Sequence, residues 1–278
     1  MTDWKTISKI DAHIHLMPED VIQANPGSHF ADFGSLEEYQ KIMEKYHIEH
    51  AIVMPFNDPY MLSMDHTVKS VHKNLLSICG RSNSAIFAFA DIDPWLNLKE
   101  TLLELEEVMK NDAFIGIKIH PTNAGYPVDG SYYMSVFQWA EMHEIPVEIH
   151  SYPREHMKDD VCSPLRIKKI VRAFPKLKVS VAHLGGFQYE ELIDCPVYLN
   201  LSAVLTDLAH RYGIKKTNEI LRRYDTKRLV FATDYPDNRR LKPTEIYERY
   251  FNILNALDYT QEEVERICKY NILEMLGK

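Results

Sequence analysis

The stretch Asp11-Ala12-His13-Ile14-His15 closes a short apolar run and lies just ahead of a loop that contains proline, asparagine and glycine. Side chains of an extended strand alternate between its two faces, so we expect Asp11, His13 and His15 on one face and Ala12 and Ile14 on the other. Neutral imidazole nitrogen suits zinc and similar divalent ions, and two imidazoles at one strand end supply half of a metal site. The alternative for so short a motif is a half-exposed strand with two solvated histidines.

Length and composition favour one soluble domain. The 278 residues, 45% of them hydrophobic, are enough to bury one large core. A net charge of -8 disfavours a surface that grips phosphate backbones, so nucleic acid is not an expected partner. The four cysteines are scattered and predict reduced thiols. The N-terminus lacks a secretory pattern, and no apolar run reaches the roughly 18 residues of a membrane span, so we expect a cytoplasmic protein without a membrane partner.

Beyond residue 15 the chain alternates between short apolar runs and segments whose apolar residues recur at helical spacing. The predicted strands span residues 7–15, 50–56, 85–92, 114–120, 146–150, 177–183, 197–204 and 228–234. The predicted helices span residues 35–46, 63–79, 98–110, 133–143, 165–174, 214–224, 244–257 and 261–276. Ser35 is expected to cap the first of these helices, and Gly80 is expected to end the second.

Eight strands separated by helices indicate a parallel sheet, because parallel strands need crossover connections. Closure of eight such units predicts an α/β fold, a (β/α)8 TIM barrel that forms a single domain over residues 1–278. An open doubly wound sheet is the alternative, but no Gly-x-Gly-x-x-Gly follows the first strand. The loops at 17–34 and 153–164 are long enough to cover a site.

Polar side chains occur at the ends of five of the eight predicted strands. Active sites of (β/α)8 barrels gather at the C-terminal ends of the strands. Polar groups there are costly unless they are paired or ligated, so the pattern predicts that they meet at one site. Unrelated histidines, each satisfied separately, are the alternative. The residues concerned are His13, His15, Lys118, His120, His150, His183 and Asp234.

Five longer segments carry a resemblance to a known family. They are Ile10-Asp-Ala-His-Ile-His15, Gly116-Ile-Lys-Ile-His-Pro121, Pro146-Val-Glu-Ile-His150, Val181-Ala-His-Leu-Gly-Gly186 and Phe231-Ala-Thr-Asp-Tyr-Pro236. Their order and spacing, along nearly the whole chain, resemble the amidohydrolase superfamily and most closely its amidohydrolase-related (amidohydrolase 2) branch. That branch holds lactonases and aromatic or vinylogous acid decarboxylases, so the resemblance implies a metal-dependent enzyme.

The resemblance also implies a role for the residues at the strand ends. His13, His15 and Asp234 would bind the first metal ion, with His150 as the further ligand. His183 would bind a second ion in a dinuclear site. In a mononuclear site His183 would be catalytic and would orient water or polarise the substrate.

The chemistry of such a site supports these roles. A divalent ion held by three imidazoles and one carboxylate, with a coordination position open, lowers the pKa of bound water from about 16 toward about 7. Asp234 can accept the proton of that water and pass it to the leaving group. We expect zinc, with manganese as the alternative, and one ion, with two kept open. A turn residue before Pro236 is the alternative for Asp234.

Lys118, His120 and Arg239 are candidates for substrate binding. Strand alternation places Lys118 and Glu148 on inward faces, where they can form a buried ion pair. An amine that binds a substrate anion is a second alternative for Lys118. A carboxylated lysine that bridges two metals, as in dinuclear members of the superfamily, is a third. Arg239 can hold a substrate carboxylate through two parallel hydrogen bonds, although a solvated pair with Arg240 is the alternative.

The predicted function is that of a metal-dependent hydrolase that cleaves an amide, lactone or ester bond of a small molecule, expected to be anionic. One alternative is a metal-dependent nonoxidative decarboxylase, a lyase, acting on an aromatic or dienoic acid. Another is a non-catalytic metal-binding barrel that kept the fold and lost the chemistry. A nuclease is disfavoured by the acidic charge and by Lys118, where the deoxyribonuclease branch has glutamate. A small-molecule substrate is thus the expected partner, and a homo-oligomer is left open.

Overall fold

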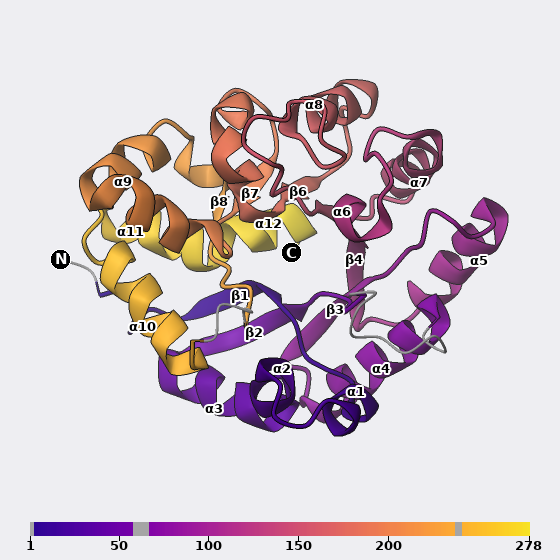
Figure 1. Ribbon diagram of the computed structural model, residues 1–278, viewed down its shortest axis with the longest axis horizontal. Coiled ribbons are helices and arrows are strands. Elements are labelled where there is room, and N and C mark those ends of the chain that lie inside the picture. Colours follow the sequence, from indigo (N-terminus) through magenta and orange to yellow (C-terminus); the bar gives the residue numbers. More distant parts are fainter. Residues whose placement is uncertain (1–2, 58–66, 237–240) are drawn as a thin grey trace.

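The computed structural model describes residues 3–57, 67–236 and 241–278, and within them eight parallel strands form one sheet in chain order (Figure 1). The last strand returns to the first through backbone hydrogen bonds of Ala12 with Phe231 and of His15 with Tyr235, so the sheet closes into the predicted (β/α)8 barrel. The strands are β1 (Lys9–Ile14), β2 (Ile48–Val53), β3 (Ile86–Ala90), β4 (Phe114–Ile119), β5 (Val147–Ile149), β6 (Val179–Val181), β7 (Tyr198–Asn200) and β8 (Leu229–Val230).

Helices surround the sheet and cover its outer face (Figure 1). The longer ones are α3 (Leu36–Tyr46), α4 (Val68–Arg81), α5 (Leu98–Val108), α7 (Ser131–Met142), α8 (Pro164–Ala173), α9 (Val204–Leu221) and α10 (Pro243–Leu254). The remaining helical segments are α1 (Glu19–Ala24), α2 (His29–Phe33), α6 (Pro121–Ala124), η1 (Ala182–Leu192), η2 (Thr226–Arg228), α11 (Gln261–Glu265), η3 (Arg266–Tyr270) and α12 (Asn271–Leu276). Within the described residues no helix combines the length and the apolar character that crossing a membrane requires.

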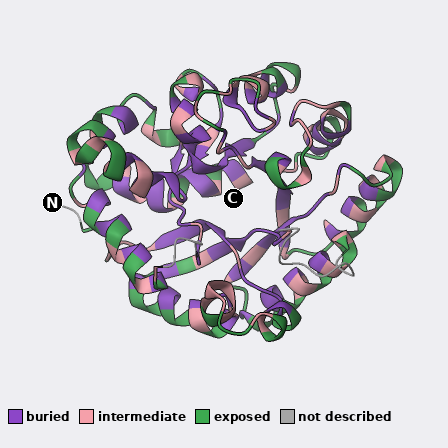
Figure 2. Ribbon diagram, viewed as in Figure 1, coloured by how far each residue is buried: buried purple, intermediate pink, exposed green. Residues whose placement is uncertain are grey.

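The buried apolar residues form two layers. Figure 2 shows buried residues along the strands and exposed ones on the outer sides of the helices. Between strands and helices, Ile117 of β4 belongs to the same apolar cluster as Phe137 of α7. A separate cluster joins Phe89 of β3 to Ile272 and Met275 of α12. Burial of this apolar surface is the main favourable contribution to folding.

Glycine at position 116 makes room for the cluster that contains Phe89, which we call the inner cluster. Gly116 of β4 pairs with Phe89 of β3, and a Cβ added at 116 would lie 2.6–2.8 Å from atoms of the Phe89 ring. Such a distance is below van der Waals contact, so the ring occupies the space that any other residue at 116 would fill.

The boundaries of several predicted elements differ from those in the structure. Ser35 caps α3 as predicted, because its side chain accepts a hydrogen bond from the backbone of Glu38. The Gly80 prediction is wrong: α4 continues to Arg81, and Ser82 is its C-cap. The strand predicted at 50–56 begins earlier, at Ile48, and the strands predicted at 177–183, 197–204 and 228–234 are shorter.

Several helices also differ from the prediction. The helix predicted at 214–224 begins at Val204 and bends at Gly213, and the loop at 17–34 contains α1 and α2. The final helix, predicted at 261–276, is interrupted by the π-helical turn η3. These differences arise because tertiary contacts set where an element ends, whereas periodicity only indicates that it exists.

Asp11 and His13 do not share an environment, contrary to the alternation expected for β1. The pairing of β1 with β2 is irregular between Asp11 and Ile14. The Asp11 carboxylate accepts hydrogen bonds from the hydroxyls of Thr233, at 2.6 Å, and of Tyr247 on α10, at 2.5 Å. An irregularity of this kind re-aims one side chain relative to its neighbours, so Asp11 ties β1 to β8 and α10 and takes no part in the histidine group.

Candidate metal centre

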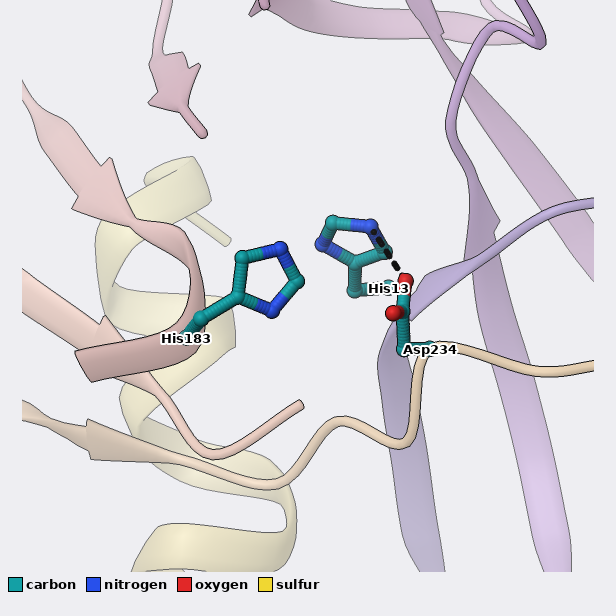
Figure 3. A group of neighbouring side chains, drawn as sticks. All are labelled: His13, His183 and Asp234. Carbon is teal, nitrogen blue, oxygen red and sulfur yellow. Dashed lines mark ion pairs between the residues drawn. The ribbon is translucent and has the colours of Figure 1, made fainter. Parts of the chain in front are cut away.

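The ends of β1 and β8 bring two imidazoles, of His13 and His15, together with the carboxylate of Asp234. Figure 3 shows His13 and Asp234 of this group with His183 beside them. Nε2 of His13 lies 3.1 Å from Nε2 of His15 and 3.2 Å from Oδ1 of Asp234. Nε2 of His15 lies 3.5 Å from the same Asp234 oxygen. The three side chains therefore converge on one small region, as the sequence predicted.

His183 joins this group from the end of β6. One ligand atom from each of His13, His183 and Asp234 lies within 4.8 Å of the others. Nε2 of His183 also lies 3.1 Å from Nδ1 of His150, which follows β5. His150 therefore adjoins the group through His183.

Burial and hydrogen bonding shift the pKa values of these side chains, in most cases toward the protonation states that metal ligands need. His13 is the exception: burial would lower its pKa, but the charge of Glu148 and hydrogen bonds with Asp234 and Glu148 outweigh it and raise that pKa. Burial lowers the pKa of His183 to about 4 and holds the pKa of His150 well below its usual range. It also lowers the pKa of His15. Burial alone would raise the pKa of Asp234, but hydrogen bonds with His13 and His15 outweigh it and hold that pKa well below its usual range. Neutral imidazoles and an ionised carboxylate bind divalent cations without first losing protons.

Glu148, on β5 inside the barrel, contacts His13 and orients its ring. Oε1 of Glu148 lies 2.7 Å from Nδ1 of His13, and Oε2 accepts a hydrogen bond of 2.9 Å from the side chain of Asn200. A hydrogen at Nδ1 of His13 is therefore donated to Glu148, and Nε2 is the ring nitrogen that faces His15 and Asp234. A carboxylate behind an imidazole is the usual way in which a metal-binding histidine is oriented.

Lys118 forms the buried ion pair that the sequence allowed. Its Nζ lies 2.8 Å from Oε1 of Glu148, and Lys118 is 1% exposed. Burial would raise the pKa of Glu148, but the charges of Lys118 and His13 outweigh it and hold that pKa well below its usual range. The lysine amine is thus engaged at the base of the site and does not project toward solvent.

Two left-handed backbone positions aim side chains into the site. His183 has φ of 60° and Asp234 has φ of 67°, and non-glycine residues adopt such values rarely and at a cost. The backbone of His183 donates to Oδ1 of Asn200 at 3.0 Å, while its Nδ1 lies 2.9 Å from the Ser202 hydroxyl. These contacts, all from the end of β7, fix the turn after β6 and the orientation of the His183 ring.

His120 lies beside His150 at the ends of β4 and β5. The two rings stack with centroids 3.9 Å apart and an interplanar angle of 14°. Nδ1 of His120 accepts a hydrogen bond of 3.2 Å from the backbone of Asn123. Arg239, the third predicted substrate-binding residue, lies outside the described residues.

Asn200 and Ser202 are site residues that the sequence interpretation did not single out. Asn200 is fully buried at the end of β7, where it contacts Glu148 and His183, and Ser202 contacts His183. The signal was present, because both are polar residues in the apolar run predicted at 197–204. The reasoning that selected the histidines, applied to this strand, would have selected these two residues.

Comparisons with known proteins agree with this geometry. The sequence profile of the amidohydrolase family matches residues 10–278, whereas no curated protein matches the chain.

Solved structures similar to this chain share the whole fold at low identity. A probable 2-pyrone-4,6-dicarboxylic acid hydrolase from Acinetobacter baumannii, with citric acid bound, has a TM-score of 0.69 and 12% identity over 98% of this chain and 100% of that one. A 5-carboxyvanillate decarboxylase from Novosphingobium aromaticivorans, in complex with manganese and a nitrobenzoic acid, has a TM-score of 0.71 and 14% identity over 99% and 97%. An uncharacterized TIM-barrel protein from Bordetella bronchiseptica has a TM-score of 0.72 and 18% identity over 98% and 100%. With the profile match over almost its full length, the chain belongs to the amidohydrolase family.

Proposed function

We propose that the protein is a metal-dependent hydrolase that cleaves an amide, lactone or ester bond of a small molecule. The observation that carries the proposal is the convergence of His13, His15 and His183 with the ionised Asp234 at one end of the barrel. Nitrogen and carboxylate donors at such distances are the ligands that zinc and manganese take in proteins. Membership of the amidohydrolase family supports the same conclusion.

His13, His15, His150 and Asp234 would hold the ion, with His183 as a further ligand or as the residue that orients water. When bound, a divalent ion supplies Lewis acidity and lowers the pKa of a coordinated water. Zinc is the proposed ion because imidazoles dominate the site. Manganese is the alternative, since the 5-carboxyvanillate decarboxylase structure contains it. One ion is proposed because the amine of Lys118 is paired with Glu148, which disfavours a carboxylated lysine that bridges two ions.

Asp234 would manage the protons of the reaction. Its pKa is held well below the usual range, so the carboxylate is ionised at neutral pH and can accept a proton from water. The left-handed backbone at Asp234 presents this carboxylate beside both histidines of β1. The same group can then donate the proton to the leaving atom of the substrate.

A nonoxidative decarboxylase is the second candidate function. Its support is the likeness to decarboxylases of aromatic acids, such as the Novosphingobium aromaticivorans enzyme. The same residues would serve it, with Asp234 taking a proton from water and passing it to the carbon that loses the carboxylate. A non-catalytic barrel that only binds metal is the third candidate. A small molecule is the proposed partner, the cytoplasm is the proposed location, and residues 1–278 are proposed to act as one domain.

Metal analysis of protein purified without chelators tests the metal site. We expect close to one equivalent of zinc or manganese, and less than about half an equivalent with no uptake of added ion would contradict the proposal. His13→Ala should lose the ion. The exposed His210 provides the matched control, because His210→Ala removes an imidazole from the surface of α9 and should retain it.

Turnover assays separate the candidate functions. Panels of lactones, amides and esters should give hydrolysis products in the metal-loaded protein, whereas release of carbon dioxide from aromatic or dienoic acids would favour the decarboxylase. Asp234→Asn should abolish either activity, and the control Asp112→Asn, at an exposed position before β4, should not. Activity that survives Asp234→Asn would place the chemistry elsewhere.

A further inference from the structure

The ends of the strands divide into two halves with different chemistry. The candidate ligands come from β1, β5, β6 and β8, and the ends of β2, β3 and β4 carry a chain of hydrogen-bonding groups that includes no amine or guanidinium. We call this chain the amide arc and define it as Asn57, Asp91, Asn123 and His120. A substrate whose reacting group lies at the ligands would extend its remaining part toward the opposite strands.

Hydrogen bonds link the members of the amide arc in sequence. The side chain of Asn57 donates to Oδ1 of Asp91 at 2.9 Å, and the side chain of Asn123 donates to Oδ1 of Asn57 at 3.0 Å. The backbone of Asn123 donates to Nδ1 of His120 at 3.2 Å. Because Nδ1 of His120 is an acceptor, the hydrogen of the neutral ring is at Nε2, which is therefore a donor.

Asp91 is the buried member that holds the arc in place. It is 5% exposed, and its backbone amide donates to Nε2 of His72 at 3.0 Å, while Nδ1 of His72 lies 2.9 Å from a carboxylate oxygen of Glu104. These hydrogen bonds hold Asp91 in place. Because Oδ1 of Asp91 accepts from the amide nitrogen of Asn57, the amide oxygen of Asn57 is left to accept from Asn123. Groups held in this way are characteristic of preorganised binding sites.

Each carboxamide retains hydrogen-bonding capacity beyond the bonds of the arc. A carboxamide offers two N–H donors and one oxygen that accepts twice, and the bonds within the arc use only part of this set in the described residues. Asn57 is half-buried and Asn123 is exposed, so both can meet a ligand. The arc can therefore donate to and accept from one and the same group.

Positive charge is absent from the loops that carry the arc. Among the described residues, the segments 54–57, 91–97 and 120–126 contain no lysine or arginine, and they include Asp91 and Asp93. The amine of Lys118, on β4, is paired with Glu148. Recognition of a carboxylate or phosphate normally relies on arginine, lysine or a helix terminus, so this half of the site is unsuited to an anion.

We propose that the amide arc is a recognition subsite for an uncharged group of the substrate that both donates and accepts hydrogen bonds, a carboxamide or hydroxyl, and that it rejects an anion there. Asn57, Asn123 and His120 contact this group, and Asp91 is a positioning residue that acts through Asn57. The inference rests on the proposed function, because it assigns the part of the substrate that lies away from the metal.

A set of benzohydroxamates tests the subsite in the zinc-loaded protein. The hydroxamate binds the metal, and the ring carries hydrogen, carbamoyl or carboxylate at the meta or para position. We expect the better carbamoyl isomer to bind roughly tenfold more tightly than the unsubstituted probe, as two ordinary hydrogen bonds would provide. The carboxylate isomers should bind no more tightly than the unsubstituted probe.

Variants identify the residues responsible. Asn57→Leu and Asn123→Leu should remove the carbamoyl advantage and leave the affinity of the unsubstituted probe and the zinc content unchanged. Asp91→Asn should reduce the ratio of carbamoyl to unsubstituted affinity, a readout that a purely structural role would not change. Asn252→Leu, at an exposed position of α10, is the matched control. Since Asn123 is exposed, its replacement tests the proposal even where Asn57→Leu fails to fold.

Two outcomes would overturn the inference in distinguishable ways. A carboxylate probe that binds more tightly than its carbamoyl counterpart, or a carbamoyl advantage that survives both asparagine replacements, overturns the subsite and leaves the proposed function standing. If the protein takes up no stoichiometric zinc and the unsubstituted probe does not bind, the metal site is overturned, and the subsite with it.

Discussion

The carboxylate of Glu148 lies 2.7 Å from Nδ1 of His13, while the other ring nitrogen of His13 lies 3.2 Å from Asp234. The His13 ring thus links the Glu148 carboxylate, inside the barrel, to the Asp234 carboxylate at the end of the barrel. The contact with Asp234 lies within the group of candidate ligands. The contact with Glu148 orients the His13 ring and so affects how strongly His13 can bind a metal ion.

Glu148→Gln should weaken metal binding by about 10–100-fold, the usual effect of losing the carboxylate behind a ligand histidine. Gln keeps the shape of the side chain but no longer favours a hydrogen at Nδ1 of His13. Competition with a chromogenic chelator measures the affinity. Glu106→Gln, on the exposed side of α5, is the control, and equal zinc affinity in both variants would show that Glu148 does not orient His13.

Lys118→Met should destabilise the metal-free protein by about 3–5 kcal/mol, because it leaves the buried charge of Glu148 without its partner. The double variant Lys118→Met/Glu148→Gln should recover more than half of the loss, since the remaining amide carries no charge. Urea unfolding in the presence of a chelator measures both free energies. Lys99→Met, at an exposed position, should change little, and a single variant as stable as the wild type would show that the ion pair does not form.

Gly116→Ala should destabilise the protein by about 1–3 kcal/mol, because the new methyl group overlaps the ring of Phe89. Phe89→Leu in the same chain should relieve part of the overlap. Thermal unfolding of the two single variants and the double variant gives the coupling between the sites. Additive effects would mean that the ring does not occupy the space above Gly116.

Asp91 should make stability depend on pH. Burial raises the pKa of Asp91 to about 7, whereas an aspartate in the unfolded chain titrates near 4. Between these values the folded protein holds a proton that the unfolded chain has lost, so the contribution of Asp91 to stability falls as the pH rises from about 4 to about 7 and is constant above that.

Asp91→Asn removes this titration, and the comparison of the two proteins isolates it. Relative to the variant, the wild type should lose up to about 4 kcal/mol between pH 4 and pH 7, which corresponds to about three pKa units. Chemical unfolding at several pH values measures the difference. A constant difference across this range would indicate that the carboxyl ionises as it does in the unfolded chain.

Much of the site could be predicted from the sequence because strand ends are local features. An apolar run followed by histidine places that histidine at the end of a barrel strand whatever the exact boundaries of the strand are. The pairing of Lys118 with Glu148 was also within reach, since both face inward on consecutive strands, and the structure places them opposite each other in the β4–β5 register. Membership of the amidohydrolase family follows from the same segments.

Other features depend on contacts that periodicity does not encode. The irregular pairing after Asp11 changes which side chains share a face, and it arises from how β1 fits between β2 and β8. The contact of His13 with Glu148 joins strands four positions apart around the barrel. The bond between Asn57 and Asp91 depends on where two loops meet, and alternation within a strand carries no information about that.

The inner cluster has a consequence for how the chain folds. Strand β1 is synthesised before the other strands of the barrel, yet Ile10 and Ala12 pack in a cluster with Ile272 and Met275 of α12, which is synthesised some 260 residues later. Chains grow from the N-terminus and contacts between distant residues form slowly, so the part of β1 that α12 covers stays exposed until that helix has been made. Completion of the barrel interior is therefore a late event in folding, and the growing chain depends on α12 to cover a surface that β1 exposed much earlier.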